Sequence, residues 1–132
     1  MNVEAMNGAM LAFAGDAYYD LKVREMLVRR GVSKSHRFHQ LAVSYVSAKA
    51  QAAVLMRLID DGFLSDVELD VVRRGRNVKS GSIPKHTDMI VYRQSTAFEA
   101  LVGYLYLAGE FVRLDELVAR SIEIRDSGDV SE

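Results

Sequence analysis

Hydrophobic residues recur along nearly the whole chain at the spacing of three to four residues that places them on one face of a helix. This pattern predicts helices over residues 4–30, 36–60, 66–74, 88–108 and 111–126. Segments that alternate apolar and polar residues are short, and no hairpin turn stands between two of them, so strands are not expected. The pattern therefore predicts an all-α fold.

Turn and capping residues divide these helices. Gly31 and Gly109 follow apolar runs and are expected to end helices. Ser65 followed by Glu68 is typical of a capping box at the start of a short helix. Gly75 and the stretch 80–84 are expected to break that helix, which leaves 75–87 as a loop, and the next helix is expected to be interrupted near Tyr92.

The length of 132 residues suits one domain, which we expect to span residues 1–126, followed by a frayed acidic tail at 127–132. The chain has no cysteine, which excludes disulfides and thiolate metal sites and fits a reducing cytoplasm. Glu4 stands where a signal peptide would be basic, and the apolar runs are shorter than the roughly 20 residues that cross a bilayer. We expect a cytoplasmic protein without a membrane partner.

Charge is unevenly distributed along the chain. The net charge is only −1, yet residues 73–86 contain five Lys or Arg and no acid. Proteins that coat nucleic acid without specificity are usually basic overall. This balance instead predicts that phosphate groups are bound at one place, the basic segment 73–86.

Two acidic residues stand alone in apolar surroundings. Asp16 is the only charged residue between positions 5 and 19, and Glu99 is the only one between 94 and 109. A carboxylate removed from water normally binds a cation or changes its pKa. We expect folding to bring these two acids, 83 positions apart, into one metal site. The alternatives are that Asp16 simply reaches solvent and that Glu99 pairs with a buried arginine.

Small residues near both acids predict close packing. Glycine inside a helix costs roughly 1 kcal/mol relative to alanine, so it usually marks a close approach of another group. Gly15 precedes Asp16, and alanines surround it, which favours packing against another helix, of the same chain or of a second subunit. This small-residue face is our first choice for the contact of a dimer. Gly103 lies one turn after Glu99 and either leaves space for a ligand or allows a helix contact.

The basic segment also carries amide and hydroxyl donors, which suit phosphate and ribose oxygens better than a plain charged surface does. The candidate RNA-binding residues are Arg73, Arg74, Arg76, Asn77, Lys79, Ser80 and Lys85. A solvated surface is the alternative. In the segment 46–52, Lys49 and Gln51 either join helices, which we favour, or touch RNA.

Four stretches, 11–24, 46–52, 73–88 and 92–107, resemble in order and spacing the Mini-ribonuclease III proteins, the compact branch of the ribonuclease III family. The resemblance implies an all-helical domain that dimerises and cleaves double-stranded RNA with Mg²⁺, for which Mn²⁺ substitutes, without a separate RNA-binding domain. It also implies that Asp16 and Glu99 are catalytic. Larger relatives have further acids where this chain has Ala9, Ala12 and Thr96.

The resemblance further implies maturation of the ends of precursor 23S ribosomal RNA, with the need for a ribosomal-protein helper left open.

Two other functions are considered. One is a non-catalytic RNA-binding or ribosome-assembly module that uses the basic segment 73–86. The other is an all-α nucleotide pyrophosphohydrolase, which normally needs several acids at helical spacing on two helices, a pattern that neither acid-bearing segment here offers.

Overall fold

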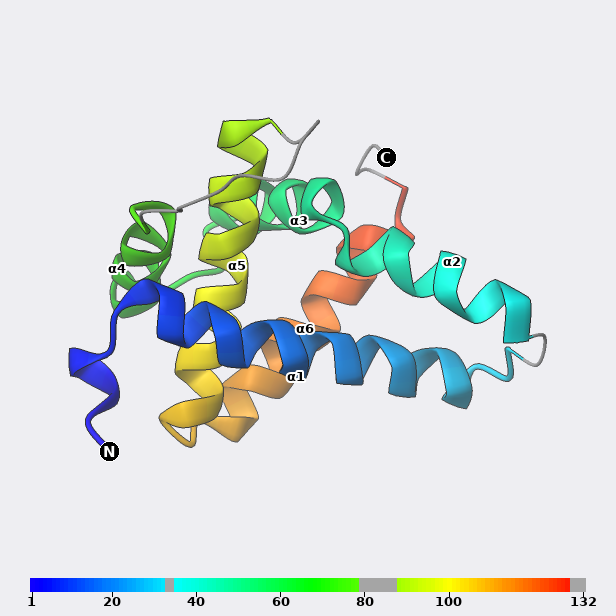
Figure 1. The fold of residues 1–132 in the computed structure, drawn as a ribbon, viewed down its shortest axis with the longest axis horizontal. Coiled ribbons are helices and arrows are strands. Elements are labelled where there is room, and N and C mark those ends of the chain that lie inside the picture. Colours follow the sequence, from blue (N-terminus) through cyan, green and yellow to red (C-terminus); the bar gives the residue numbers. More distant parts are fainter. Residues whose placement is uncertain (33–34, 79–87, 129–132) are drawn as a thin grey trace.

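Helices make up the fold of the described residues, which are 1–32, 35–78 and 88–128 of this computed structural model (Figure 1). No strand occurs in these ranges, so the predicted all-α class is confirmed. The elements are the 3-10 helix Val3–Ala5, α1 (Gly8–Arg29), α2 (Ser35–Val46), α3 (Ala48–Asp60), α4 (Asp66–Arg76), α5 (Met89–Leu107) and α6 (Phe111–Asp126). Within the described ranges, no helix is long and apolar enough to cross a membrane. The predicted tail at 127–132 lies outside them from residue 129 onward.

The predicted helix over 36–60 is wrong in one respect, because it consists of two helices. Ser47 leaves the helical conformation, and its side chain accepts a hydrogen bond from the backbone N–H of Ala50 at 3.2 Å. That bond satisfies an N–H group at the start of α3, where no helical partner exists. A serine inside an amphipathic pattern was therefore the signal of a break.

Two other boundaries differ from the prediction. The interruption near Tyr92 is absent, since Asp88 caps the backbone N–H groups of Ile90 and Val91 and α5 continues to Leu107. Gly75 does not end α4, which continues to Arg76. The missing side chain of Gly75 lets α4 pack on α5, because a Cβ there would lie 2.7 Å from the Cα of Ala97.

The other start and stop signals are confirmed. Ser65 accepts from the backbone N–H of Glu68 at 3.1 Å, and the Glu68 carboxylate accepts from the backbone N–H of Ser65 at 2.9 Å, which completes the capping box. Gly109 has a φ of +74° and forms the turn between α5 and α6, a conformation that favours glycine.

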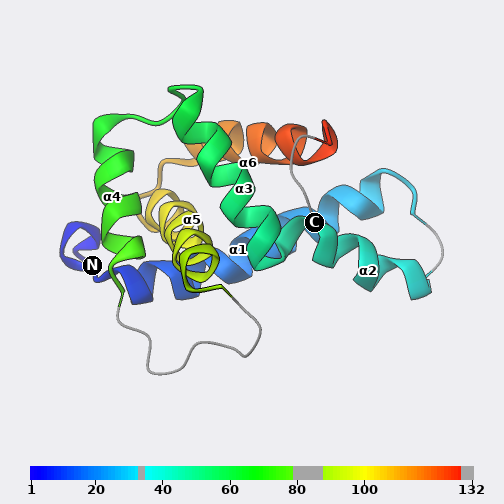
Figure 2. The same cartoon turned by 90° about the horizontal axis from the view of Figure 1, so that it is seen from above.

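Helix α5 forms the centre of the molecule. Figure 2 looks nearly along its axis and shows α1, α3 and α4 arranged around it. Nearly all of its C-terminal half is buried, with Phe98, Leu101 and Leu105 among the least exposed side chains. Because α5 contacts several layers of the fold, a side chain on it can meet residues from distant parts of the sequence.

Helix α1 crosses α5 at two glycines. A Cβ on Gly15 would lie 1.8 Å from the backbone oxygen of Glu99, and one on Gly103 would lie 1.8 Å from the backbone oxygen of Leu11. Neither position can hold a side chain, so the two backbones touch. The expectation that the small-residue face around Gly15 forms a dimer contact is therefore wrong, because α5 of the same chain covers Gly15. The contact also explains Gly103 without a ligand.

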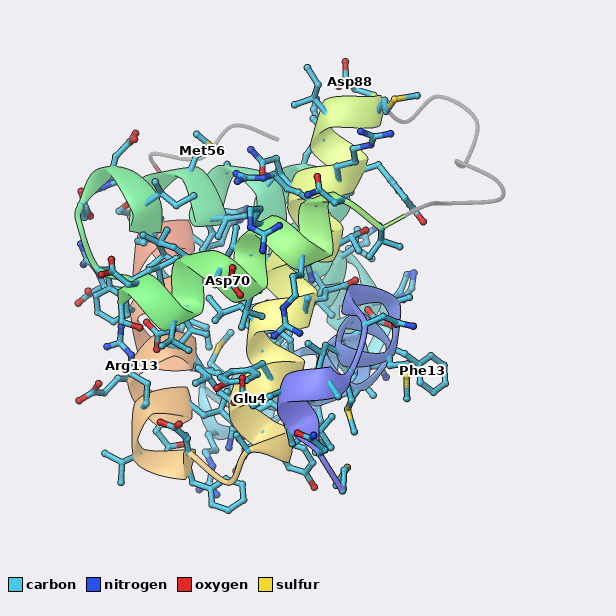
Figure 3. The ribbon with its side chains drawn as sticks, turned by 90° about the vertical axis from the view of Figure 1, so that its left-hand side faces the viewer. Glu4, Phe13, Met56, Asp70, Asp88 and Arg113 are labelled. Carbon is cyan, nitrogen blue, oxygen red and sulfur yellow. The ribbon has the colours of Figure 1, made fainter. Side chains whose placement is uncertain are left out.

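Helix α4 is anchored at both ends. At its start, the Glu68 carboxylate accepts two hydrogen bonds of 2.8 Å from Arg113 of α6. Arg113, labelled in Figure 3, also donates to the backbone oxygen of Phe63 at 2.5 Å. At its end, Arg74 donates to the backbone oxygens of Glu4 and Met6 at 3.2 and 3.0 Å. These contacts fix the direction in which the chain leaves α4.

Candidate active site

Asp16 and Glu99 lie next to each other at the crossing of α1 and α5. Gly15 brings the backbone of α1 against the carbonyl of Glu99, and Asp16 is the next residue along α1. The carboxyl groups of Asp16 and Glu99 are in hydrogen-bonding contact. Asp16 is exposed and Glu99 is partly buried, so the pair is open to solvent on the Asp16 side. Folding thus brings together the two acids that the sequence singled out.

The surroundings of Glu99 disfavour its negative charge. Burial, together with the hydrogen bond to Asp16 and the charge of Asp16, raises the pKa of Glu99 from its ordinary value to about 9. A hydrogen bond from Gln51 acts in the opposite direction. Among the described residues, no lysine or arginine contributes to this pKa shift, so the alternative in which Glu99 pairs with a buried arginine is wrong.

Gln51 and Ser95 belong to the same polar cluster, and the sequence analysis did not place them there. Gln51 is 1% exposed and accepts a hydrogen bond of 2.7 Å from the Ser95 hydroxyl. The favoured interpretation of Gln51 as a residue that joins helices is confirmed, since it links α3 to α5. A signal was present: Val54, Leu55 and Leu58 follow Gln51 at helical spacing, which puts this amide on the buried face of α3.

The donor set at the crossing suits a hard divalent cation. Carboxylate oxygens are the ligands that Mg²⁺ prefers, and Mg²⁺ normally retains several waters when only one or two carboxylates hold it. Among the described residues, no group of three or more His, Cys, Asp or Glu side chains is placed to hold a metal. The two carboxylates Asp16 and Glu99 therefore fit a cation that completes its coordination with water and with substrate oxygens.

Of the seven candidate RNA-binding residues, the structure describes four, and three of these lie in the last turn and at the C-terminal cap of α4 with side chains that are exposed or partly buried. Arg73 is exposed and pairs with Asp70 at 2.7 Å, Arg76 is partly buried, and Asn77 is exposed at the end of α4. An exposed ion pair such as Arg73–Asp70 contributes little to stability, so the guanidinium can exchange its partner for a phosphate. Lys79, Ser80 and Lys85 lie outside the described residues.

Arg74 is placed differently from the expectation. Its guanidinium binds the backbone carbonyls of Glu4 and Met6, and its side chain is 22% exposed. Both bonds are donated by the same nitrogen, Nη1. The structure therefore gives Arg74 a role in holding the N-terminal segment against α4, a role that the run of basic letters could not reveal.

The segment that leaves α4 starts against the first turn of α1, the helix that carries Asp16. Val78 lies against the start of α1, because a Cβ on Gly8 would be 2.8 Å from a methyl group of Val78. Asp16 is eight residues further along α1, a distance of about 12 Å at 1.5 Å per residue. The other end of the segment joins α5 at Asp88, on the helix that carries Glu99.

Comparisons with known proteins agree with this geometry. Residues 9–110 match the Ribonuclease III domain, and this span contains both acids and the whole of α4 and α5. A crystal structure of a protein from Fusobacterium nucleatum has the same fold, with a TM-score of 0.78 and 25% identity over 90% of this chain and 93% of that one. The fold and the matched domain define an endoribonuclease.

Proteins with similar sequences place the chain in one branch of the ribonuclease III family. Mini-ribonuclease 3 of Brevibacillus brevis is 51% identical over 89% of this chain and 87% of its own length. Mini-ribonuclease 3 of Thermoanaerobacter sp. is 45% identical over 92% and 84%, and that of Streptococcus pneumoniae is 40% identical over 93% and 96%. The chain therefore belongs to the ribonuclease III family, within its Mini-ribonuclease 3 branch.

Proposed function

We propose that this endoribonuclease cleaves double-stranded RNA with Mg²⁺ held by Asp16 and Glu99, and that Mn²⁺ substitutes for it. The observation that carries the proposal is the contact between two carboxyl groups, one of them partly buried, with no cationic side chain among the described groups that shift the pKa of Glu99. Such a pair is unfavourable when both members are ionised. A divalent cation bound by both carboxylates would offset the repulsion between their negative charges.

The chain contributes position and charge to the reaction. Asp16 and Glu99 project from two helices whose backbones are locked together at Gly15 and Gly103, so their separation is set before substrate arrives. When bound, the divalent ion supplies Lewis-acid charge to the scissile phosphate and lowers the pKa of water. No third His, Cys, Asp or Glu side chain among the described residues completes a metal site with these two acids, so water and an RNA phosphate would supply the remaining ligands.

The RNA backbone is proposed to lie along the end of α4. Arg73, Arg76 and Asn77 project there, and Lys79, Ser80 and Lys85 follow in the chain. Duplex RNA is recognised mainly through its phosphates, its 2′-hydroxyls and its shape. A cluster of cationic and amide donors that begins next to the start of α1 can hold such a backbone while the acids meet one of its phosphates.

The enzyme is proposed to act as a homodimer through the outer face of α1. Met10 is 53% exposed, Phe13 86%, Leu21 61% and Val28 66%, and helical spacing places them on the side of α1 opposite to α5. Figure 3 shows Phe13 projecting from the molecule. A helix that is apolar on two opposite sides is normally covered on both. A second copy would cover this stripe and bring a second acid pair for the other RNA strand.

We assign the substrate to the ends of precursor 23S ribosomal RNA in the cytoplasm, with a ribosomal protein as an optional helper. This assignment is supported by membership of the Mini-ribonuclease 3 branch. A test is incubation of the protein with a terminal stem of that precursor, with the product ends mapped. Accurate cuts at the stem support the assignment, and an intact stem beside efficient cleavage of unrelated duplexes contradicts it.

The catalytic part of the proposal is tested with Glu99→Gln, which keeps the size of the side chain. The variant should bind duplex RNA as the wild type does and should lose nearly all Mg²⁺-dependent cleavage. A matched control is Glu116→Gln on α6, an exposed position away from the crossing, which should leave cleavage unchanged. Cleavage at the wild-type rate by the Glu99 variant would show that this carboxylate does not hold the metal.

A further inference from the structure

The amide of Gln51 connects two consecutive turns of α5. Its oxygen accepts a hydrogen bond of 2.7 Å from Ser95. Glu99 lies four residues further along the same face of α5, and hydrogen bonding from Gln51 lowers the pKa of its carboxyl group. Because the oxygen is engaged by Ser95, the group left for Glu99 is the NH₂, which only donates. Gln51 is therefore held in one orientation, with its donor directed at the carboxylate.

We infer that Gln51 is a positioning residue of the active site, which orients the Glu99 carboxylate towards the position of the metal, with Ser95 fixing the amide. This inference rests on the proposed role of Glu99. A carboxylate that accepts a bond from a fixed amide cannot rotate freely, so its remaining lone pairs keep one direction. Side chains that orient metal ligands in this way typically change metal affinity by 10–100-fold when they are replaced.

The burial of the cluster supports this role over simple helix joining. Gln51 is 1% exposed and Ser95 is 8% exposed, whereas Glu99 is open enough to reach Asp16 at the surface of the crossing. The Ser95 hydroxyl satisfies only the oxygen of the Gln51 amide and leaves its NH₂ group available to Glu99. The second bond, to Glu99, extends the network from the core to the acid pair.

The test uses Gln51→Met, which keeps an unbranched side chain of similar length and removes both hydrogen bonds. The affinity of the protein alone for Mn²⁺ should weaken about tenfold. It is measured from the electron paramagnetic resonance signal of the free ion. The Mg²⁺ concentration that half-saturates cleavage should rise by a similar factor, and high Mg²⁺ should restore most of kcat. Gln40→Met, at an exposed position on α2, is the control and should match the wild type.

A merely structural role gives a different result. Gln51→Met would then lower the melting temperature while leaving the Mn²⁺ affinity unchanged, which would overturn the inference. If that variant does not fold, Ser95→Ala decides, since it releases only the amide oxygen and should weaken Mn²⁺ binding in the same direction by a smaller factor. Unchanged Mn²⁺ affinity in a folded Ser95→Ala protein would then overturn it.

Glu99→Gln is measured in parallel to separate the two claims. Loss of Mn²⁺ binding and cleavage in this variant, beside wild-type behaviour of Gln51→Met, refutes only the positioning role. Wild-type Mn²⁺ binding and cleavage by Glu99→Gln refutes the proposed function itself, and the positioning role with it.

Discussion

The backbone of Gly15 lies directly against the backbone carbonyl of Glu99, so close that a Cβ on Gly15 would be 1.8 Å from that oxygen. This contact links the fold to the site, because Asp16 follows Gly15 in α1 and the second carboxylate of the pair belongs to Glu99. The distance between the two acids is therefore set by a helix crossing that no larger residue permits.

Gly15→Ala should consequently destabilise the protein by about 3 kcal/mol, since the added methyl group must push α1 away from α5. The sign is diagnostic, because the same change at an unobstructed helix position stabilises by roughly 1 kcal/mol. The measurement is urea unfolding followed by circular dichroism. A more stable variant would show that the two backbones do not touch at this point.

The raised pKa of Glu99 predicts that the metal-free protein becomes less stable as the pH rises from about 5 to 9. In this range the folded state keeps a proton on Glu99, whose pKa is about 9, whereas the unfolded chain has released it near its ordinary value of 4.5. Each unit of pH then costs up to about 1.4 kcal/mol of unfolding free energy. Mg²⁺ should oppose the loss, because the metal binds the deprotonated carboxylate.

Thermal unfolding in a chelator at several pH values measures this dependence. Glu68 and Asp126 have lowered pKa values, so their contributions are lost only as the pH falls well below 5 and do not mask the trend. Glu99→Gln should flatten the dependence and be more stable than the wild type at pH 8. An equal slope in both proteins would mean that Glu99 ionises at its ordinary pKa.

The exposed stripe of α1 predicts that Phe13→Asp converts a dimer into a monomer, because a charge would be buried in an apolar contact. Sedimentation velocity measures the mass of both proteins. Val112→Asp is the matched control: Val112 is 79% exposed on α6 and lies off the stripe, so this variant should remain dimeric. A dimer that survives Phe13→Asp would place the contact on another surface.

The contrast between Arg73 and Arg74 predicts different losses on replacement by alanine. Arg73→Ala should weaken RNA binding and reduce the slope of log affinity against log salt by about 1, as expected when one phosphate contact is lost. Arg74→Ala should leave that slope unchanged and lower the melting temperature, since its guanidinium holds the backbone at Glu4 and Met6. Equal salt slopes for the two variants would contradict the assignment of a phosphate contact to Arg73 and of a structural role to Arg74.

Much of this account could be predicted from the sequence because its signals are local. Helix spacing, the capping box at Ser65 and the two isolated acids each depend on neighbouring residues alone. The break at Ser47 is also local, since its side chain caps α3, whereas the continuation of α4 through Gly75 and the engagement of Arg74 depend on tertiary packing. Gln51 combines the two cases. Its helical spacing predicts that it lies on a buried face of α3, whereas its partners Ser95 and Glu99 lie on α5 and could not be predicted from neighbouring residues.

The most direct test of the central claim is a double-mutant cycle of Asp16→Asn and Glu99→Gln on single-turnover cleavage of duplex RNA at saturating Mg²⁺. If the two carboxylates hold one metal, each single variant should lose activity on the order of 10³-fold, and the double variant should be little worse than either. Losses that multiply to the order of 10⁶-fold would contradict the claim, because they would show that the two acids act independently.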